Sequence, residues 1–384
     1  MNSYDSLPSP CYIMSEASLE ANLQLLNLVQ QEAGVSIICA LKGMSFWHSF
    51  PLIKHYLPGA TASSLNAARL TSEVMCCDAH TYAPIYLENE FPQLLIYSSH
   101  LTFNSLSQWD KYKDTALNCP KKVSFGLRVN PEYSEIETDL YNPALPGSRL
   151  GILAEDMPEN LPEGIEGLHF HVLCENDSYA LEHCLEAFEQ RFAKYIRQCK
   201  WVNFGGGHHI TRADYNILHL IQLLKDFRNR YPNLEDVILE PGEAVGWQTG
   251  VLTSTVEDIV VNKGIKIAML NVSFACHMPD CLEMPYKPTV LGAHEPTEND
   301  KFVYRLGGCS CLAGDYIGMG DFAFDEPLEV GDRIVFDDMI HYTMVKTTFF
   351  NGVAHPAIGM IHKDGEFELL SEPGDYESYK AKLG

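Results

Sequence analysis

The spacing of apolar residues changes repeatedly along the first two thirds of the chain. Between residues 16 and 31, Leu19, Leu23, Leu26 and Val29 recur at intervals of three and four, which predicts an amphipathic helix. Short apolar runs then alternate with further helical patterns, and each run is long enough for one buried strand. We expect eight such strands, at residues 35–41, 60–64, 78–84, 94–99, 125–130, 168–172, 201–204 and 237–240. Eight alternations of strand and helix predict a TIM (β/α)8 barrel rather than an open doubly wound sheet.

The pattern becomes purely β-like near residue 251. Short β-branched or aromatic runs are separated by Gly, Pro and Asp turns, and no long helical pattern follows. The Asn351-Gly352 pair predicts a hairpin turn, and Cys-Tyr-Ile at 11–13 predicts one early strand. The expected strands of this part lie at residues 253–261, 302–306, 333–336 and 343–349. We therefore predict a barrel domain at 14–250 and an all-β domain at 251–384, which the N-terminal strand within 1–13 joins.

Composition narrows the classes of partner. The chain has 384 residues, 46% of them hydrophobic, and a formal net charge of −24. A core of ordinary size is expected, whereas nucleic-acid phosphates would be repelled and a cationic small molecule would be attracted. No apolar run approaches the roughly 20 residues of a membrane span, and residues 1–10 lack the basic and apolar regions of a secretory signal. With twelve cysteines expected as reduced thiols, we predict a cytoplasmic protein without nucleic-acid or membrane partners.

Unusual residues fall at the C-terminal ends of the predicted barrel strands. Lys42 closes the first strand, His171 the sixth, Gly205-Gly206-Gly207 the seventh and Glu240-Pro241-Gly242 the eighth. In a TIM barrel the functional residues lie at these ends, because the βα loops meet there. A lysine is seldom buried without a partner, since its ammonium is costly to desolvate. Lys42 therefore either reaches solvent or takes part in chemistry, and the coincidence of the four strand ends favours chemistry.

These four segments together fit a phosphorylated aromatic cofactor. A glycine run lets backbone N–H groups approach an anion closely, and the loops after strands seven and eight are the usual phosphate site of a TIM barrel. A tight turn alone would also explain the glycines. With a lysine, a carboxylate and a histidine nearby, the set matches the needs of pyridoxal phosphate. Lysine binds this cofactor covalently, a carboxylate keeps its pyridine nitrogen protonated, and an aromatic ring covers one face.

With these motifs, nearly the whole chain resembles the fold III pyridoxal-phosphate decarboxylases, the group of ornithine, arginine and diaminopimelate decarboxylases. The resemblance implies an alanine racemase-like fold, with a barrel and a second β domain, and a homodimer. Within the group, the chain is most similar to the carboxynorspermidine decarboxylases. This implies decarboxylation of carboxynorspermidine and carboxyspermidine to norspermidine and spermidine, in polyamine biosynthesis. The segments that carry the resemblance are 40–43, 169–172, 205–207, 240–242, 277–286, 308–315 and 339–343.

The resemblance also implies roles for matching residues. Lys42 would hold the cofactor covalently, His171 would stack on its ring and Glu240 would pair with the pyridine nitrogen. Cys311 would return a proton to the substrate Cα, reaching into the barrel of the partner subunit across the dimer interface. The implied phosphate contacts are Gly206, Gly207, Gly242 and Tyr342, and Arg149 would support side chains near the ring.

Two departures from the group's motifs bear on the substrate. Glu243 replaces the arginine of Glu-Pro-Gly-Arg, which counts against a substrate with a second carboxylate such as diaminopimelate. Leu312 replaces the aspartate that follows the cysteine in ornithine decarboxylase, so another acid must bind the distal amine. Our candidates are Asp280 and Glu283, together with Asp315 near Cys311.

Other functions remain open at this level. A decarboxylase of another basic amino acid, namely diaminopimelate, ornithine or arginine, is the main alternative. His169-x-His171 resembles a metal pair, but metal-dependent barrel hydrolases usually carry that pair on the first strand; we expect no metal site. A non-catalytic pyridoxal-phosphate carrier would be a single barrel and would lack the β domain.

Overall fold

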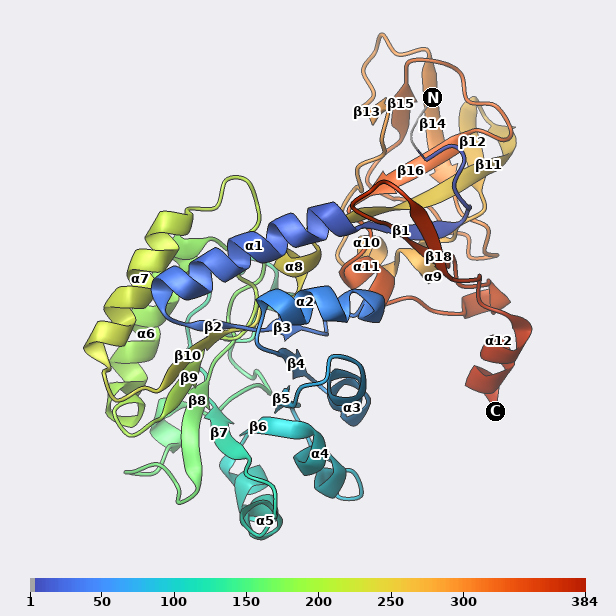
Figure 1. The fold of residues 1–384 in the computed structure, drawn as a ribbon. Coiled ribbons are helices and arrows are strands. Elements are labelled where there is room, and N and C mark those ends of the chain that lie inside the picture. The colour runs from blue at the N-terminus through green and yellow to red at the C-terminus, as the bar shows by residue number, and fades with distance from the viewer. Residues whose placement is uncertain (1–3) are drawn as a thin grey trace. The chain divides into compact units, whose positions relative to one another are not determined.

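A computed structural model describes residues 4–384. The chain divides into two compact units (Figure 1). The barrel unit is Glu20–Val245, and the sheet unit combines the N-terminal segment up to Leu19 with Gly246–Gly384. Among the described residues, no helix combines the length and the apolar character that crossing a bilayer requires.

The barrel unit contains a closed parallel sheet. Its strands are β2 (Ser36–Ile37), β3 (Cys39–Ala40), β4 (Ala60–Ala62), β5 (Ala79–Tyr82), β6 (Ser98–Phe103), β7 (Ser124–Arg128), β8 (Ile165–His169), β9 (Trp201–Asn203) and β10 (Asp236–Leu239). They are hydrogen-bonded in the order β2-β10-β9-β8-β7-β6-β5-β4-β3. Ile38, between β2 and β3, donates its N–H to Leu239 of β10, and Cys39 donates to Gly59. Because β2 and β3 are consecutive parts of one strand, the sheet closes, and the predicted TIM barrel is confirmed.

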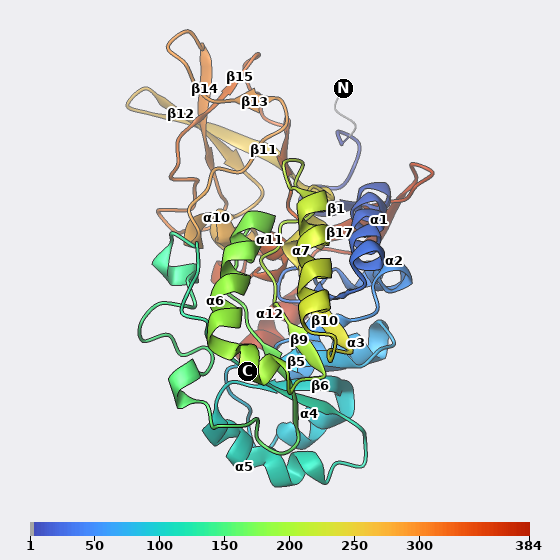
Figure 2. The same ribbon diagram turned by 90° about the vertical axis from the view of Figure 1, so that its left-hand side faces the viewer.

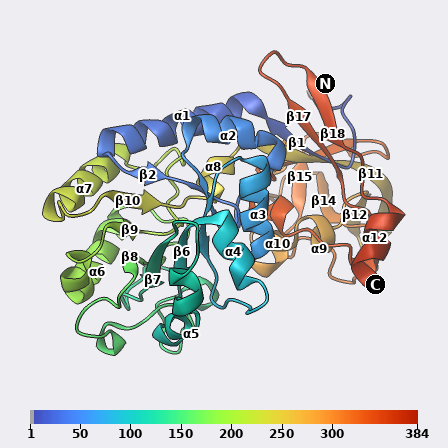
Figure 3. The ribbon, with the colours of Figure 1, turned by 60° about the horizontal axis from the view of Figure 1, so that its bottom comes forward.

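Helices lie outside these strands (Figure 3). They are α1 (Glu16–Ala33), α2 (Phe50–Tyr56), α3 (Leu65–Val74), α4 (Phe91–Tyr97), α5 (Leu106–Leu117), α6 (Ser178–Ile196), α7 (Ile217–Arg230) and α8 (Glu243–Gly246), with short 3-10 turns η1 (Trp47–Ser49), η2 (Asp139–Tyr141) and η3 (Ala154–Asp156). Polar N-caps fix several of their starts. The Ser64 hydroxyl accepts the Ala67 N–H at α3, and the Asp177 carboxylate accepts two N–H groups at α6. Such caps satisfy amides that have no partner inside the helix.

One predicted barrel strand was misplaced. Residues 94–99 were expected to form a strand, but Phe91–Tyr97 is helix α4 and β6 begins at Ser98. A short apolar run such as Leu94-Leu95-Ile96 does not distinguish a buried strand from the inner face of a helix. Pro92, in the first turn of α4, is the signal for a helix start.

Trp201 fills part of the barrel across two neighbouring strands. Its ring lies where side chains of Gly126 and Gly167 would project: a Cβ added at these positions would come within 2.3 and 2.1 Å of ring atoms. The indole N–H donates to the Ser124 hydroxyl at 2.8 Å. Trp201 is therefore a core residue, and it is 4% exposed.

We predict that Gly167→Ala destabilises the barrel unit. The new methyl group would overlap the Trp201 ring, which is held by the Ser124 hydrogen bond, and overpacking a core costs about 1–3 kcal/mol. The measurement is the free energy of unfolding in urea. Gly59→Ala is the matched control, because its Cβ would come no nearer than 3.9 Å to another group, Cys77 Sγ. Equal stabilities of the two variants would contradict the packing role of Trp201.

The sheet unit is built around a mixed sheet (Figure 2). Its strands are β1 (Cys11–Ser15), β11 (Gly250–Asn262), β12 (Ile265–Leu270), β13 (Ala293–His294), β14 (Phe302–Gly307), β15 (Phe322–Phe324), β16 (Arg333–Asp337), β17 (Ala357–Ile361) and β18 (Phe367–Ser371). They run in the order β13-β15-β14-β12-β11-β1-β17-β18, and β16 also pairs with β11. Strand β1, from the N-terminal segment, belongs to this sheet. β1 lies between β11, which is antiparallel to it, and β17, which is parallel.

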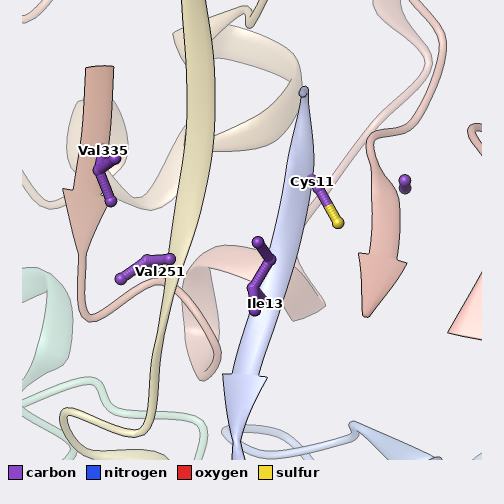
Figure 4. Packing of buried hydrophobic residues seen from close by; sticks show 5 residues of the cluster. Cys11, Ile13, Val251 and Val335 are labelled. Carbon is purple, nitrogen blue, oxygen red and sulfur yellow. The ribbon is translucent and has the colours of Figure 1, made fainter. Parts of the chain in front are cut away.

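Packing around β1 forms a core of this unit (Figure 4). Cys11 and Ile13 of β1, Val251 of β11, Val335 of β16 and Ala357 of β17 make one buried cluster. Four strands that are distant in sequence therefore share this core, and β1 is an interior part of it.

Short helices accompany the sheet where strands were expected. The predicted strand at 343–349 is wrong, because Tyr342–Val345 forms helix α11. The predicted hairpin at Asn351-Gly352 is also wrong: both lie in the 3-10 turn η4 (Phe350–Gly352), where Asn351 has φ 58°. Asparagine tolerates this left-handed conformation in many turns, and here no paired strands flank it. The other helices are α9 (Phe274–His277), α10 (Pro279–Glu283) and α12 (Tyr376–Leu383).

Candidate active site

The C-terminal ends of the barrel strands carry the chemically distinctive residues. Lys42 lies two residues beyond β3, His171 two residues beyond β8, and Glu240 directly after β10. The glycines 205–207 follow β9. This is the end of a TIM barrel at which active sites form.

Backbone packing places the Glu240-Pro241-Gly242 turn against the strand end that leads to Lys42. A Cβ on Gly242 would lie 2.7 Å from the carbonyl oxygen of Ala40 and 3.1 Å from Cα of Gly43. The Ala40 N–H also donates to the Pro241 carbonyl. The first and eighth strand ends are therefore adjacent, and only glycine fits at position 242.

The glycine loop contacts His171, which was predicted to stack on the cofactor ring. The N–H of Gly206 donates to Nδ1 of His171 at 2.8 Å. Gly205 and Gly207 have positive φ angles of 69° and 84°, which favour glycine, and a Cβ on Gly207 would lie 2.0 Å from the carbonyl oxygen of Leu173. Within residues 4–384, the Gly207 N–H donates to no acceptor. Of the two predicted phosphate contacts in this loop, Gly207 therefore keeps a backbone donor for an anion.

The His171 ring is neutral. Burial lowers its pKa well below the ordinary range, and the charges of Lys42 and Arg128 lower it further. Since Nδ1 accepts the Gly206 hydrogen bond, the proton resides on Nε2. A neutral ring fixed in this way is suited to lie flat against an aromatic ligand.

Glu240 is an ionised carboxylate inside the barrel. It is 8% exposed, and its Oε1 accepts a hydrogen bond from Nδ2 of Asn203 at 2.7 Å. Burial by itself would raise the pKa of this carboxyl, but His169 and Asn203 lower it to about 2. A carboxylate with this pKa stays charged at neutral pH and can hold a protonated ring nitrogen.

Lys42 is exposed to solvent. The surrounding protein atoms nevertheless withdraw its amine from bulk water and lower its pKa, and the charge of Arg128 acts in the same direction. Glu240 and Glu243 oppose this shift. A lowered pKa increases the fraction of uncharged amine, which is the nucleophilic form.

Sequence reasoning missed Arg128. This residue ends β7 and is 3% exposed; its Nη2 donates to the His171 carbonyl at 3.0 Å, and its guanidinium carbon lies 4.7 Å from the Tyr82 ring centre. The signal was present, because Arg128 lies near the C-terminal end of a predicted strand, as Lys42 does. A buried arginine is as unusual as a buried lysine.

Arg149, predicted to support the ring-proximal side chains, is exposed on the loop after β7. Its carbonyl accepts a hydrogen bond from Nδ2 of Asn104 at 2.8 Å. Asn104 Oδ1 in turn accepts the Tyr82 hydroxyl at 2.8 Å and the Gly151 N–H at 2.9 Å. The backbone at Arg149 is thus tied to the ends of β5 and β6.

Cys311 lies on the segment between β14 and β15, in the sheet unit, and is exposed. Asp315 organises this segment and is buried. Its Oδ1 accepts the Ala275 N–H at 2.9 Å and the Ser273 hydroxyl at 3.2 Å, and its Oδ2 accepts the Ser310 N–H at 2.9 Å. Asp315 therefore already uses both carboxylate oxygens to hold the loop on which Cys311 lies.

The remaining candidates also belong to the sheet unit. Tyr342 begins α11 and is half-buried. Asp280 and Glu283 both lie on α10 and bind the Lys346 ammonium, at 2.6 and 2.8 Å. Burial alone would lower the pKa of Lys346, but these two carboxylates raise it. The acid pair therefore already holds one cation.

Comparison with known proteins identifies the family. Residues 11–340 match the model described as pyridoxal-dependent decarboxylase, C-terminal sheet domain. The chain belongs to the pyridoxal-dependent decarboxylase family. This decarboxylase is 50% identical over 379 residues to the carboxyaminopropylagmatine decarboxylase of Synechocystis sp., covering 99% of this chain and 96% of the relative. It is 43% identical over 389 residues to the carboxynorspermidine/carboxyspermidine decarboxylase of Campylobacter jejuni, covering 99% of both chains.

Solved structures agree with this assignment. The carboxynorspermidine decarboxylase of Campylobacter jejuni, complexed with norspermidine, has a TM-score of 0.89 to this decarboxylase at 41% identity, covering 98% of this chain and 100% of that one. The diaminopimelate decarboxylase of Helicobacter pylori, at 15% identity, has a TM-score of 0.80 and covers 99% and 98% of the two chains, which supports the fold alone.

Pyridoxal phosphate fits the groups that the barrel end presents. An accessible lysine with a lowered pKa, an ionised Glu240 and a neutral His171 ring meet the needs of its aldehyde, ring nitrogen and ring face. The Gly207 N–H, which donates to no acceptor among the described residues, is a donor suited to its phosphate. The cofactor of this decarboxylase is pyridoxal phosphate, as the motifs predicted.

Proposed function

We propose that this decarboxylase removes CO2 from Cα of a carboxylated polyamine, with carboxynorspermidine and carboxyspermidine as substrates and norspermidine and spermidine as products. The observation that carries the proposal is the likeness, over nearly the whole chain, to the Campylobacter jejuni structure complexed with norspermidine. Relatives named for both substrates, at 43% and 34% identity, support it.

Carboxyaminopropylagmatine is a second candidate substrate. The relative named for it has the higher identity, 50% over 379 residues. By their names, the candidate substrates share an α-amino carboxylate on an aminopropyl chain and differ at the far end, which is an amine or a guanidine. The shared end requires the same chemistry, so the far end would decide between them.

The proposed site residues divide the work of decarboxylation. When bound, pyridoxal phosphate supplies the sink for the electron pair that CO2 leaves at Cα. Lys42 holds the cofactor through its amine, Glu240 holds a proton at the ring nitrogen and His171 covers one ring face. Cys311 Sγ of the partner subunit would deliver a proton to Cα once CO2 has departed. Of the phosphate contacts implied by the family motifs (Gly206, Gly207, Gly242 and Tyr342), Gly207 would donate its N–H, while the Gly206 N–H is already bound to His171. Arg149 would support the side chains near the ring.

Glu243 makes a second carboxylate on the substrate unfavourable. Its charge already affects Lys42, raising the pKa of the amine, so it lies where a substrate anion would meet repulsion. This supports a cationic substrate over diaminopimelate.

A substrate panel tests the proposal. Two quantities would be measured for each substrate: CO2 release, and product formation by mass spectrometry. The substrates are carboxynorspermidine, carboxyspermidine, carboxyaminopropylagmatine, ornithine, arginine, lysine and diaminopimelate. We expect the highest kcat/KM for the first two. A tenfold preference for carboxyaminopropylagmatine would select the second candidate, and activity confined to the last four would reject both.

We further propose that Asp280 and Glu283 bind the distal ammonium of the substrate, and predict that the double variant Asp280→Asn/Glu283→Gln raises KM. A hydrogen bond to a charged group contributes about 1.5–3 kcal/mol, so KM should rise about 10- to 150-fold. kcat should change little, because the distal end is remote from Cα. Steady-state kinetics with the preferred polyamine substrate measures both quantities.

Lys346→Met is the control for this prediction. It removes the same two ion pairs but leaves both carboxylates in place, so a purely structural role of the pairs would raise KM equally in both variants. A KM that stays at the wild-type value in the acid variant would show that these acids serve only Lys346. Asp315 already accepts three hydrogen bonds, so any contact that it makes with substrate would be additional to them.

We also propose a homodimer in which Cys311 of each subunit serves the active site of the other; the resemblance to the family supports this arrangement. A cytoplasmic location is supported by twelve cysteines that are all free thiols in the structure.

Domain boundaries at 14–250 and 251–384, with 1–13 joining the second domain, remain part of this proposal.

A further inference from the structure

Asn203 links the carboxylate of Glu240 to the glycine loop. It is 3% exposed at the end of β9. Its Nδ2 donates to Oε1 of Glu240 at 2.7 Å, while its Oδ1 accepts the N–H of Gly205 at 2.8 Å. An amide can do both because it carries a donor and an acceptor on one rigid plane.

His169 approaches the other oxygen of the same carboxylate. It is 2% exposed, and its Nε2 lies 3.6 Å from Oε2 of Glu240. His169 and Asn203 are paired in register on the neighbouring strands β8 and β9. Two adjacent strands therefore direct one polar side chain each to the two oxygens of Glu240.

The charge of the side chain at position 203 determines whether Glu240 can ionise. A carboxylate there would lie 2.7 Å from that of Glu240, and two carboxyl groups this close share one proton, because both cannot ionise at that distance. Because the Asn203 amide is neutral, Glu240 is the one negatively charged residue among Asn203, His169 and Glu240.

We propose that Asn203 and His169 are positioning residues that clamp Glu240, and that Asn203 couples the orientation of this carboxylate to the conformation of the glycine loop. The proposal rests on the proposed function only in that Glu240 is taken to face the ring nitrogen of pyridoxal phosphate. Gly206, next to Gly205, also holds His171. One loop thereby sets the ring-stacking side chain and, through Asn203, the carboxylate.

The first test uses the protein without cofactor. In the wild type, the folded-state pKa of Glu240 is about 2, below the ordinary value of about 4.3. Its contribution to stability is therefore present above pH 4.3 and is lost as the pH falls towards 2. In Asn203→Asp the shared proton raises one folded-state pKa instead, so the melting temperature should fall relative to wild type as the pH rises from 5 to 8.

Two comparisons isolate the role of Glu240. Asn130→Asp also places an acid at a buried asparagine, 5% exposed and just beyond β7, and measures the general cost of burying it. Between pH 5 and 8, the melting temperature of Asn203→Asp should decrease more, relative to wild type, than that of Asn130→Asp. The additional decrease should disappear when Glu240→Gln is also present. An equal pH dependence in both backgrounds would overturn the clamp.

The second test measures cofactor binding. Asn203→Ala and His169→Gln should each weaken the affinity for pyridoxal phosphate, measured by absorbance titration, about 10- to 100-fold, while Asn130→Ala should not. Unchanged affinity in both clamp variants would reject the proposal, and His169→Gln alone decides if Asn203→Ala does not fold. Failure of the wild type to bind pyridoxal phosphate would refute the proposed function, whereas the cofactor-free titration would still decide the clamp.

Discussion

Replacing Lys42 with alanine is expected to abolish both CO2 release and the covalent attachment of pyridoxal phosphate. Lys42 presents an accessible amine at the barrel end where Glu240, His171 and the glycine loop meet, and its lowered pKa favours the reactive uncharged form. Attachment would be measured by borohydride reduction followed by mass spectrometry of the peptides, and activity with the preferred polyamine substrate.

Lys54→Ala is the control, since Lys54 lies on α2 of the same barrel unit and donates to the Pro58 carbonyl. It should retain both activity and attachment at residue 42. A reduced cofactor adduct in Lys42→Ala at wild-type stoichiometry would mean that another amine holds the cofactor.

Mixing inactive Lys42→Ala and Cys311→Ala homodimers should restore about a quarter of wild-type activity. If each site combines Lys42 of one subunit with Cys311 of the other, random exchange makes about half of the dimers mixed. Each mixed dimer then has one site with both defects and one site with neither. Restored activity would be measured as CO2 release against time after mixing.

Subunit exchange must be shown independently, with subunits that carry different affinity tags. If tagged mixed dimers form and activity stays at the level of the separate variants, both residues act within one chain and the shared site is wrong. Mixing either variant with itself provides the baseline.

The fold could be predicted well where strands and helices have distinct patterns. All eight expected barrel strands overlap observed ones, because each is a short apolar run between helical patterns, but the run at 94–99 shares only Ser98 and Ser99 with β6. The error at 94–99 arose where apolar periodicity was too short to separate helix from strand, and the cue at Pro92 was overlooked. In the sheet unit, residues 343–352 were misassigned, since the β-branched and aromatic residues there lie in the short helix α11 and the turn η4.

For the candidate site, the sequence predicted which residues lie at the strand ends but not which residues contact them. The end of a strand can be predicted from the sequence, so Lys42, His171 and Glu240 could be placed at the same end of the barrel. The partners of these residues depend on strand register, and no pattern in the sequence indicates that His169 faces Asn203 across β8 and β9. Nor could sequence foresee that Lys346 occupies the acid pair at Asp280 and Glu283, because these residues are distant in the chain.

The position of β1 has a consequence for how the protein is made. Cys11 pairs with Thr253 of β11 and with Ala357 of β17, so β1 leaves the ribosome well before both of its partner strands. At about 5–20 residues per second, the wait for β17 lasts roughly 20–70 s. During this time the apolar segment Cys-Tyr-Ile-Met has no sheet to join, while all of Glu20–Val245 is synthesised. An unpaired strand of this kind has exposed backbone hydrogen-bonding groups, so during synthesis β1 is a segment at which two nascent chains could exchange strands.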